Sequence, residues 1–157
     1  RNLNAATELI TRLWRENPEE PTVAGELVRT MTKVSELHRL TGDFDAALRA
    51  STVAEQALAW LRTRSPAATA HLDELVELRL ERGLVQKELG RLDEAETCWR
   101  EVVAAADLVA EAEWSKQTRL ELLGALHNLA RVESERGDLR AGMQRMERCV
   151  AIEQSIV

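Results

Sequence analysis

Hydrophobic residues recur along the chain at spacings of three and four, which is the pattern of amphipathic helices. In the first segment, for example, Leu3, Ile10 and Trp14 fall on one helical face. Seven glycines and three prolines among 157 residues are too few for many short strands. The pattern predicts seven helices, over residues 2–16, 21–41, 43–63, 66–89, 92–112, 115–136 and 139–156.

Two of these boundaries depend on local signals. Ser65 followed by Pro66 is typical of a helix start, because serine caps the helix and proline fits its first position. Residues 108–116 contain neither glycine nor proline, so the helices on either side could run into each other there.

The helices are organised as a repeat. Gly42, Gly90 and Gly137 lie 48 and 47 residues apart, and a fixed period of this size is typical of a repeat array. A glycine suits the left-handed position that ends a helix, and the acidic residues just behind suit the next helix start. The flanking positions also match, with small residues seven before each glycine (Ser35, Gly83, Ala130) and five after it (Ala47, Ala95, Gly142). Each glycine therefore marks the turn of a helical hairpin.

These segments resemble tetratricopeptide repeats (TPR). Residues 90–103 read GRLDEAETCWREVV, close to the turn and second helix of that family, with Trp99 at its large position. Residues 126–139 read LHNLARVESERGDL, which is similar to the kinesin-light-chain-like branch. The resemblance covers about residues 22–157 and implies an all-α, right-handed superhelix (solenoid) of antiparallel hairpins. The period exceeds the usual length of about 34 residues, and Arg79 and Arg82 replace apolar residues of the family pattern.

The repeats define the expected domain organisation. We expect residues 1–157 to form a single domain, with residues 1–16 as the helix of a preceding partial repeat. The three repeats then cover residues 21–64, 65–113 and 114–157. Because the sequence begins with arginine, we expect it to be a fragment of a longer protein.

Composition narrows the classes of function. A net charge of −6 and five aromatic residues argue against a nucleic-acid partner, and no apolar run reaches the roughly 18 residues of a membrane span. Cys98 and Cys149 lie far apart in sequence, which favours reduced thiols and a cytoplasmic location. We therefore expect neither a nucleic acid nor a membrane as partner.

Catalytic and metal-binding signatures are also missing from the sequence. It contains no nucleophile elbow, phosphate-binding loop or dinucleotide-binding glycine motif, and the carboxylates fit solvated helix faces. His38, His71 and His127 occupy different repeat positions, so they are not expected to form a metal site. Trp114 is the best candidate for an exposed anchor, although packing is its more common role. We expect no enzyme, no metal and no cofactor.

The resemblance implies a binding groove. In that family the first helices of successive repeats line a concave groove that takes an extended peptide or a partner helix. At matching positions this chain carries Arg29, Lys33, Glu36, Leu80, Glu81, Leu84, Lys87, His127, Asn128 and Arg131. Asn128 is the most specific of these, because an amide can both donate and accept when it clamps a peptide backbone.

Three functions are compatible with these features of the sequence. The favoured one is a non-catalytic scaffold, part of a larger protein, that binds a protein or peptide partner in the groove. The alternatives are a self-association module, in which exposed repeat ends form a homodimer, and a regulatory sensor of a small ligand or signalling peptide.

Overall fold

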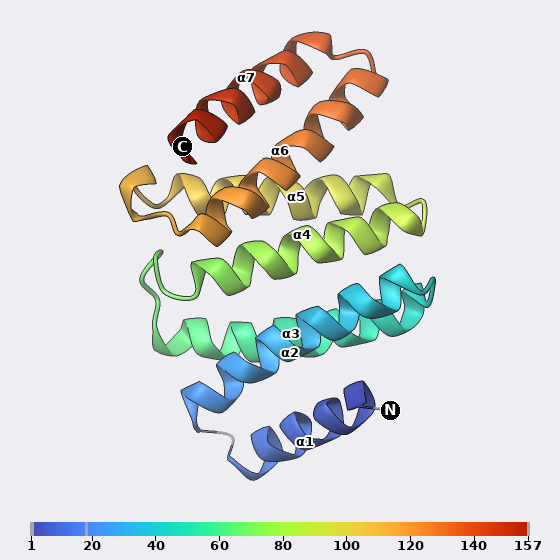
Figure 1. Cartoon of the computed structure of the whole chain (residues 1–157), viewed down its shortest axis with the longest axis vertical. Coiled ribbons are helices and arrows are strands. Elements are labelled where there is room, and N and C mark those ends of the chain that lie inside the picture. Colours follow the sequence, from blue (N-terminus) through green and yellow to red (C-terminus); the bar gives the residue numbers. More distant parts are fainter. Residues whose placement is uncertain (1, 18, 157) are drawn as a thin grey trace.

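The computed structural model describes residues 2–17 and 19–156, in which it contains seven α-helices, one short 3-10 helix and no strand (Figure 1). The prediction of an all-helical chain with seven helices is confirmed for these residues. The helices are α1 (Asn2–Glu16), α2 (Pro21–Leu40), α3 (Phe44–Arg64), α4 (Leu72–Glu88), α5 (Leu92–Asp107), α6 (Lys116–Glu135) and α7 (Leu139–Ile156), and the 3-10 helix η1 spans Glu111–Glu113.

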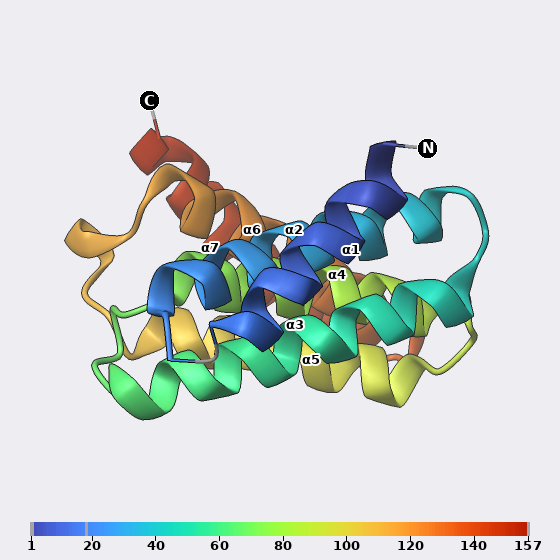
Figure 2. The ribbon, with the colours of Figure 1, turned by 90° about the horizontal axis from the view of Figure 1, so that it is seen from below.

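The helices from α2 onward form three hairpins, α2–α3, α4–α5 and α6–α7, which follow one another along the molecule (Figure 1). The first helix of each hairpin contacts both helices of the hairpin before it, so α4 packs on α2 and α3, and α6 on α4 and α5. Helix α1 packs on α2. Figure 2 shows α2 and α6 along one side of the molecule and α3 and α5 along the other. The first helices therefore share one face.

The turn glycines are the cause of the hairpins. Gly42, Gly90 and Gly137 have φ angles of +82°, +73° and +88°, in the left-handed region that glycine adopts without strain. The amide after each glycine donates to the carbonyl five residues earlier, as in the bond from Asp43 N to His38 O at 2.9 Å. Asp43 then caps α3 by accepting from the amide of Ala46. The predicted glycine turns are confirmed.

Two clusters of buried side chains make up the core. One joins α2 and α3 with Leu78 of α4, and Trp14 of α1 packs on its edge. The other joins α4, α5, α6 and α7 around Trp99, which is completely buried. Small residues such as Ala47 and Ala95 are also completely buried. The predicted core role of Trp99 is confirmed.

The predicted start of the helix at Pro66 is wrong. Helix α4 begins at Leu72, and residues 65–69 are all exposed, so a helix there would have had no apolar face to bury. The chain instead makes a turn, with a bond from Ala70 N to Ala67 O. His71 precedes the helix with a φ of +58°, a left-handed conformation that cannot continue an α-helix.

Helix α5 also ends earlier than predicted, at Asp107 rather than residue 112. The side chain of Trp114 folds back onto this end, and its indole N–H lies 3.1 Å from the carbonyl oxygen of Ala106 and 3.2 Å from that of Val109. These bonds hold the indole against the carbonyl end of α5, where Ala106 O also accepts from the amide of Val109. Trp114 is half-buried against the core, so its role here is packing rather than that of an exposed anchor.

Candidate functional site

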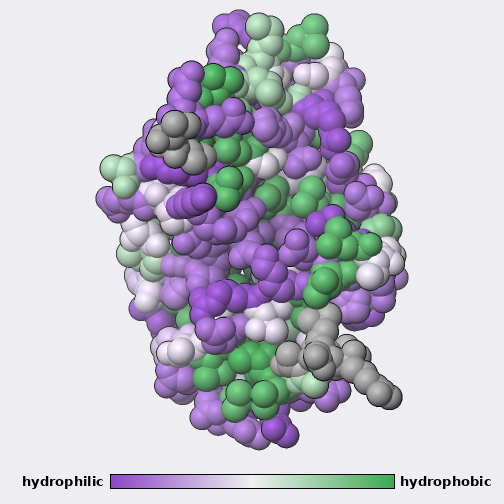
Figure 3. Space-filling model, viewed as in Figure 1, coloured by the Kyte–Doolittle hydropathy of each residue, from purple (hydrophilic) through white to green (hydrophobic). Residues whose placement is uncertain are grey.

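The face shared by the first helices contains two adjoining hollows. The smaller, of about 190 Å³, reaches from α2 across α4 to α6. The larger, of about 410 Å³, lies beside it and shares Lys33 and Glu77 with it. Together they are lined by Arg29, Thr32, Lys33, Glu36, Arg39, Asp73, Glu74, Glu77, Leu80, Glu81, Leu84, Gln117 and Glu121. We call this surface the α2–α4–α6 groove; Figure 3 shows hydrophilic residues gathered over the middle of this face.

The ten residues that the sequence placed in a groove fall into two sets. Six of them line the α2–α4–α6 groove, namely Arg29, Lys33, Glu36, Leu80, Glu81 and Leu84. The other four, Lys87, His127, Asn128 and Arg131, are not among the lining residues of either hollow. The structure therefore brings together the candidates from the first two hairpins except Lys87, and leaves those of the third hairpin outside.

Asn128 is bonded within its own helix. Its Nδ2 donates to the carbonyl oxygen of Gly124 at 2.8 Å, and its Oδ1 accepts a longer bond of 3.4 Å from Arg131. The amide is therefore turned along α6, and a peptide backbone would have to displace both bonds to be clamped by it.

The cations of the groove are held by carboxylates. Lys33 Nζ lies 2.8 Å from Glu77 and 3.2 Å from Glu36, and the hydrogen bond to Glu77 is the main reason why the pKa of Lys33 is raised. Arg29 bridges Glu74 of α4 at 2.8 Å and Glu26 of its own helix at 2.6 Å. These pairs fix the lysine and the arginine on the acidic face of α4.

Glu81 forms the most buried ion pair of the groove. Its side chain is 7% exposed, and its two oxygens lie 3.0 and 3.1 Å from Arg39 Nε. Burial raises the pKa of Glu81, and the hydrogen bond from Arg39 opposes that rise. The pair ties α2 to α4 at the floor of the groove.

Glu121 differs from the other carboxylates. Among the described residues it has no ion-pair partner, and only the side-chain amide of Gln117 donates to it. Burial and the neighbouring negative charge of Glu77 raise the pKa of Glu121 to about 7, and the positive charge of Lys33 only partly offsets this rise. A carboxylate with a pKa near 7 facing an open hollow is a typical feature of a functional site.

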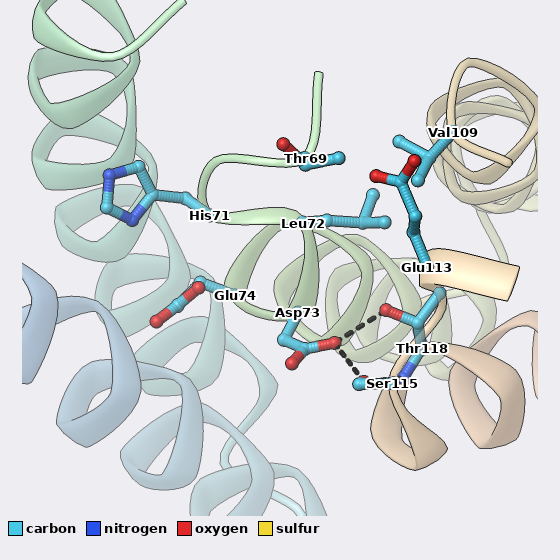
Figure 4. A pocket seen from close by; sticks show the side chains of 9 residues that line it. All are labelled: Thr69, His71, Leu72, Asp73, Glu74, Val109, Glu113, Ser115 and Thr118. Atoms are coloured by element: carbon cyan, nitrogen blue, oxygen red, sulfur yellow. Dashed lines mark hydrogen bonds between the residues drawn. The ribbon is translucent and has the colours of Figure 1, made fainter. Parts of the chain in front are cut away.

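A third hollow, of about 130 Å³, lies at the loops before α4 and α6 (Figure 4). Here Asp73 accepts hydrogen bonds from the hydroxyl groups of Ser115 and Thr118, and Ser115 also caps α6 by accepting from the amide of Thr118 at 2.9 Å. The imidazole of His71 points away from this cluster in Figure 4. The arrangement joins the starts of α4 and α6.

Several groove residues were missed, above all Glu77 and Glu121. A repeat signal could have found them. Glu77 lies at the same distance from its turn glycine as Arg29, which the sequence did place in the groove. Glu121 belongs to a series of glutamates, because Glu26, Glu74 and Glu121 each lie 16 residues before a turn glycine.

Two other properties bear on function. Within the described residues, no group of three histidine, cysteine or acidic side chains is arranged so that it could hold a metal ion. In the same part of the chain, no helix is both long and apolar enough to cross a membrane.

Comparison of the chain with protein-family models, with curated proteins and with solved structures found no match.

Proposed function

We propose that this chain is a non-catalytic binding domain whose α2–α4–α6 groove takes a cationic segment of a protein or peptide partner. The observation that carries the proposal is Glu121, a carboxylate that faces the hollow without a cationic partner among the described residues. A lysine or arginine of the occupant would supply the missing charge.

The charge balance of the groove supports a cationic occupant. Six carboxylates line it, against three cationic side chains, and all three cations are already held by carboxylates of the groove. The negative charge that remains is concentrated in concave surface, where it attracts a positively charged partner and accelerates its association.

The apolar residues of the groove suggest how the occupant lies. Leu80 and Leu84 of α4 are half-buried in the wall of the smaller hollow, one helical turn apart, beside Glu81 and Glu121. A segment that alternates apolar and cationic side chains would place its apolar side chains against the leucines and its cationic side chains against Glu121. We therefore favour an extended peptide segment over a small ligand.

We further propose that the three hairpins are long tetratricopeptide-like repeats arranged as a right-handed superhelix. The regular glycine turns and the contacts of each first helix with the preceding hairpin support this arrangement. In repeat proteins of this kind, the stacked first helices provide an extended binding surface.

Binding of labelled peptides tests the proposed function. Short peptides of equal length would carry leucine alternating with lysine, glutamine or glutamate, and fluorescence anisotropy would measure their affinity. We expect the lysine peptide alone to bind, with chemical-shift changes at the methyl groups of Leu80 and Leu84. Binding should tighten from pH 6 to pH 8, because Glu121 loses its proton in this range.

Two variants locate the site. Glu121→Gln should weaken binding of the lysine peptide about tenfold, since it removes a charge-assisted contact. Glu94→Gln is the matched control, because Glu94 is an exposed glutamate of α5 and does not line either hollow. Equal affinity of all three peptides, or an equal loss in both variants, would contradict the proposal.

A further inference from the structure

The outer face of α7 carries a continuous apolar stripe. Leu139, Met143, Met146 and Val150 are 64%, 64%, 44% and 49% exposed. Their spacing of four, three and four residues is that of the core positions of a heptad repeat. The last three also line a hollow of about 330 Å³ together with Ser134 at the end of α6. The stripe therefore has the form of a helix-packing seam.

The corresponding face of α3 is covered by another helix. Ser51 and Glu55 lie at the same distances from their turn glycine as Met146 and Val150 do from theirs. Arg82 of α4 lies 3.0 Å from Ser51 Oγ and 3.1 Å from a carboxylate oxygen of Glu55. On α3, this face is thus the surface on which the next helix packs.

Helix α5 presents a mixed face, because Trp99 and Val103, which correspond to Met146 and Val150, are buried apolar residues. Glu96 corresponds to Met143, and it is paired with Arg136 at the end of α6. Each covered face therefore offers one carboxylate to an arginine of the next first helix, Glu55 on α3 and Glu96 on α5. Since α7 offers Met143 and Val150 instead, a covering helix with such arginines would bury them without partners. A helix with an apolar stripe of the same spacing would fit.

The charged residues beside the stripe are complementary between two copies of the chain. Arg140 and Glu147 are exposed, and within the described residues neither forms an ion pair. Both follow a core position of the stripe directly, so they lie on the same edge of it. When two such helices pack antiparallel, the residues on this edge face each other across the contact. If Met143 packs on Met146 of a second copy, Arg140 lies opposite the second copy's Glu147, and the symmetry makes this pair twice.

We propose that two copies of this chain associate through α7, antiparallel about a two-fold axis. The contact is isologous, because each copy contributes the same stripe and the same two charges. It is also small, since α7 has 18 residues and extends about 27 Å at 1.5 Å per residue. Small contacts are weak, and we expect a dissociation constant on the order of 10 to 100 µM.

Sedimentation equilibrium over a range of concentrations around this dissociation constant tests the proposal. The average mass of the wild-type chain should rise from one copy towards two. Met146→Glu should remain monomeric throughout, because it places a charge in the centre of the stripe. Leu40→Glu is the matched control, since Leu40 is a similarly exposed apolar residue at the end of α2. It should dimerise as the wild type does.

A charge exchange on the exposed flanks tests the antiparallel arrangement without altering the core. Arg140→Glu and Glu147→Arg should each weaken dimerisation about threefold to tenfold, because each creates two like-charge pairs. The double variant should restore the wild-type value. A wild-type chain that stays monomeric overturns the proposal. This is the result expected if another segment or a different protein covers the stripe. A dimer that Met146→Glu leaves intact, or that the double variant fails to restore, overturns it as well.

Discussion

The indole ring of Trp99 in α5 lies directly against the backbone of Gly83 in α4. A Cβ atom at position 83 would be 2.3 Å from Nε1 of Trp99 and 2.7 Å from its Cδ1. Such distances do not occur between real side chains, so glycine is required for the approach of the two helices. The largest side chain of the core and the smallest residue of the chain thus form one packing unit.

Replacement of this glycine should strongly destabilise the fold. Gly83→Ala would force Trp99 to move within a fully packed core, and we expect a loss of about 2–3 kcal/mol in the free energy of unfolding. Urea denaturation followed by tryptophan fluorescence measures this loss.

Gly25→Ala is the matched control for that experiment. Gly25 is also a buried helical glycine, but its added Cβ would meet nothing closer than the side chain of Arg29 at 3.8 Å. The better helix propensity of alanine should raise stability by about 0.5–1 kcal/mol. If both variants lost stability equally, the contact between Gly83 and Trp99 would not be the cause.

The pair of Arg39 and Glu81 predicts a pH-dependent mutational effect. Arg39→Met leaves the buried carboxylate of Glu81 without its cation, and we expect a loss of about 2–4 kcal/mol at pH 8. Removal of Arg39 also raises the pKa of Glu81 further, so the folded state takes up a proton as the pH falls. The loss should therefore be smaller at pH 5. Urea denaturation at pH 5 and at pH 8 measures the loss of stability at each pH.

The double variant Arg39→Met/Glu81→Met is the control for this pair. Because it removes the buried charge together with its partner, it should recover most of the stability at pH 8. A loss that is the same at pH 5 and pH 8 would show that Arg39 contributes through packing and not through charge.

We expect a substitution at Glu121 to change stability and peptide binding in opposite directions. The folded protein holds the Glu121 proton up to about pH 7, whereas the carboxyl group ordinarily loses it near pH 4.5. Stability from this group is therefore complete below pH 4.5 and is lost as the pH rises through 7. The facing charges are Lys33, Glu36, Glu77 and Glu81 from α2 and α4.

Glu121→Gln stays uncharged and should avoid this loss. We expect it to be more stable than the wild type by about 1–2 kcal/mol at pH 8 and equal to it near pH 4.5. Thermal unfolding across this pH range gives the comparison, with Glu94→Gln as the unaffected control. A variant that gains stability while it loses the lysine peptide would mark Glu121 as retained for binding. A flat difference across the pH range would contradict the raised pKa.

The sequence allowed the turns to be predicted but not the charge pairing of the groove. Gly42, Gly90 and Gly137 were found because a positive φ is a local requirement that glycine meets. The repeat positions of Glu77 and Glu121 indicate the groove face, but their charge pairing depends on which side chains of neighbouring helices reach them. That reach is set by the packing of helices that lie far apart in the chain, and no short stretch of sequence records it.

Local signals also failed where tertiary contacts decide the outcome. Ser65 and Pro66 form a good helix start, yet α4 begins only at Leu72, where the chain first reaches the core. In the same way, Asn128 matched a peptide clamp by position, whereas its amide bonds to Gly124 in its own helix. A match by position identifies the face on which a residue lies, and its hydrogen-bond partners depend on the surrounding packing.

The bonds of Asp73 predict that the starts of α4 and α6 are coupled. Asp73→Ala would leave the fully buried hydroxyl of Thr118 without its acceptor, and we expect a loss of about 2–3 kcal/mol. Thr118→Val in the same background should cost little more, so the two changes should be far from additive in urea denaturation. Asp107→Ala is the control, because its surface pair with Arg148 should contribute less than about 1 kcal/mol. Additive losses at positions 73 and 118 would contradict the coupling.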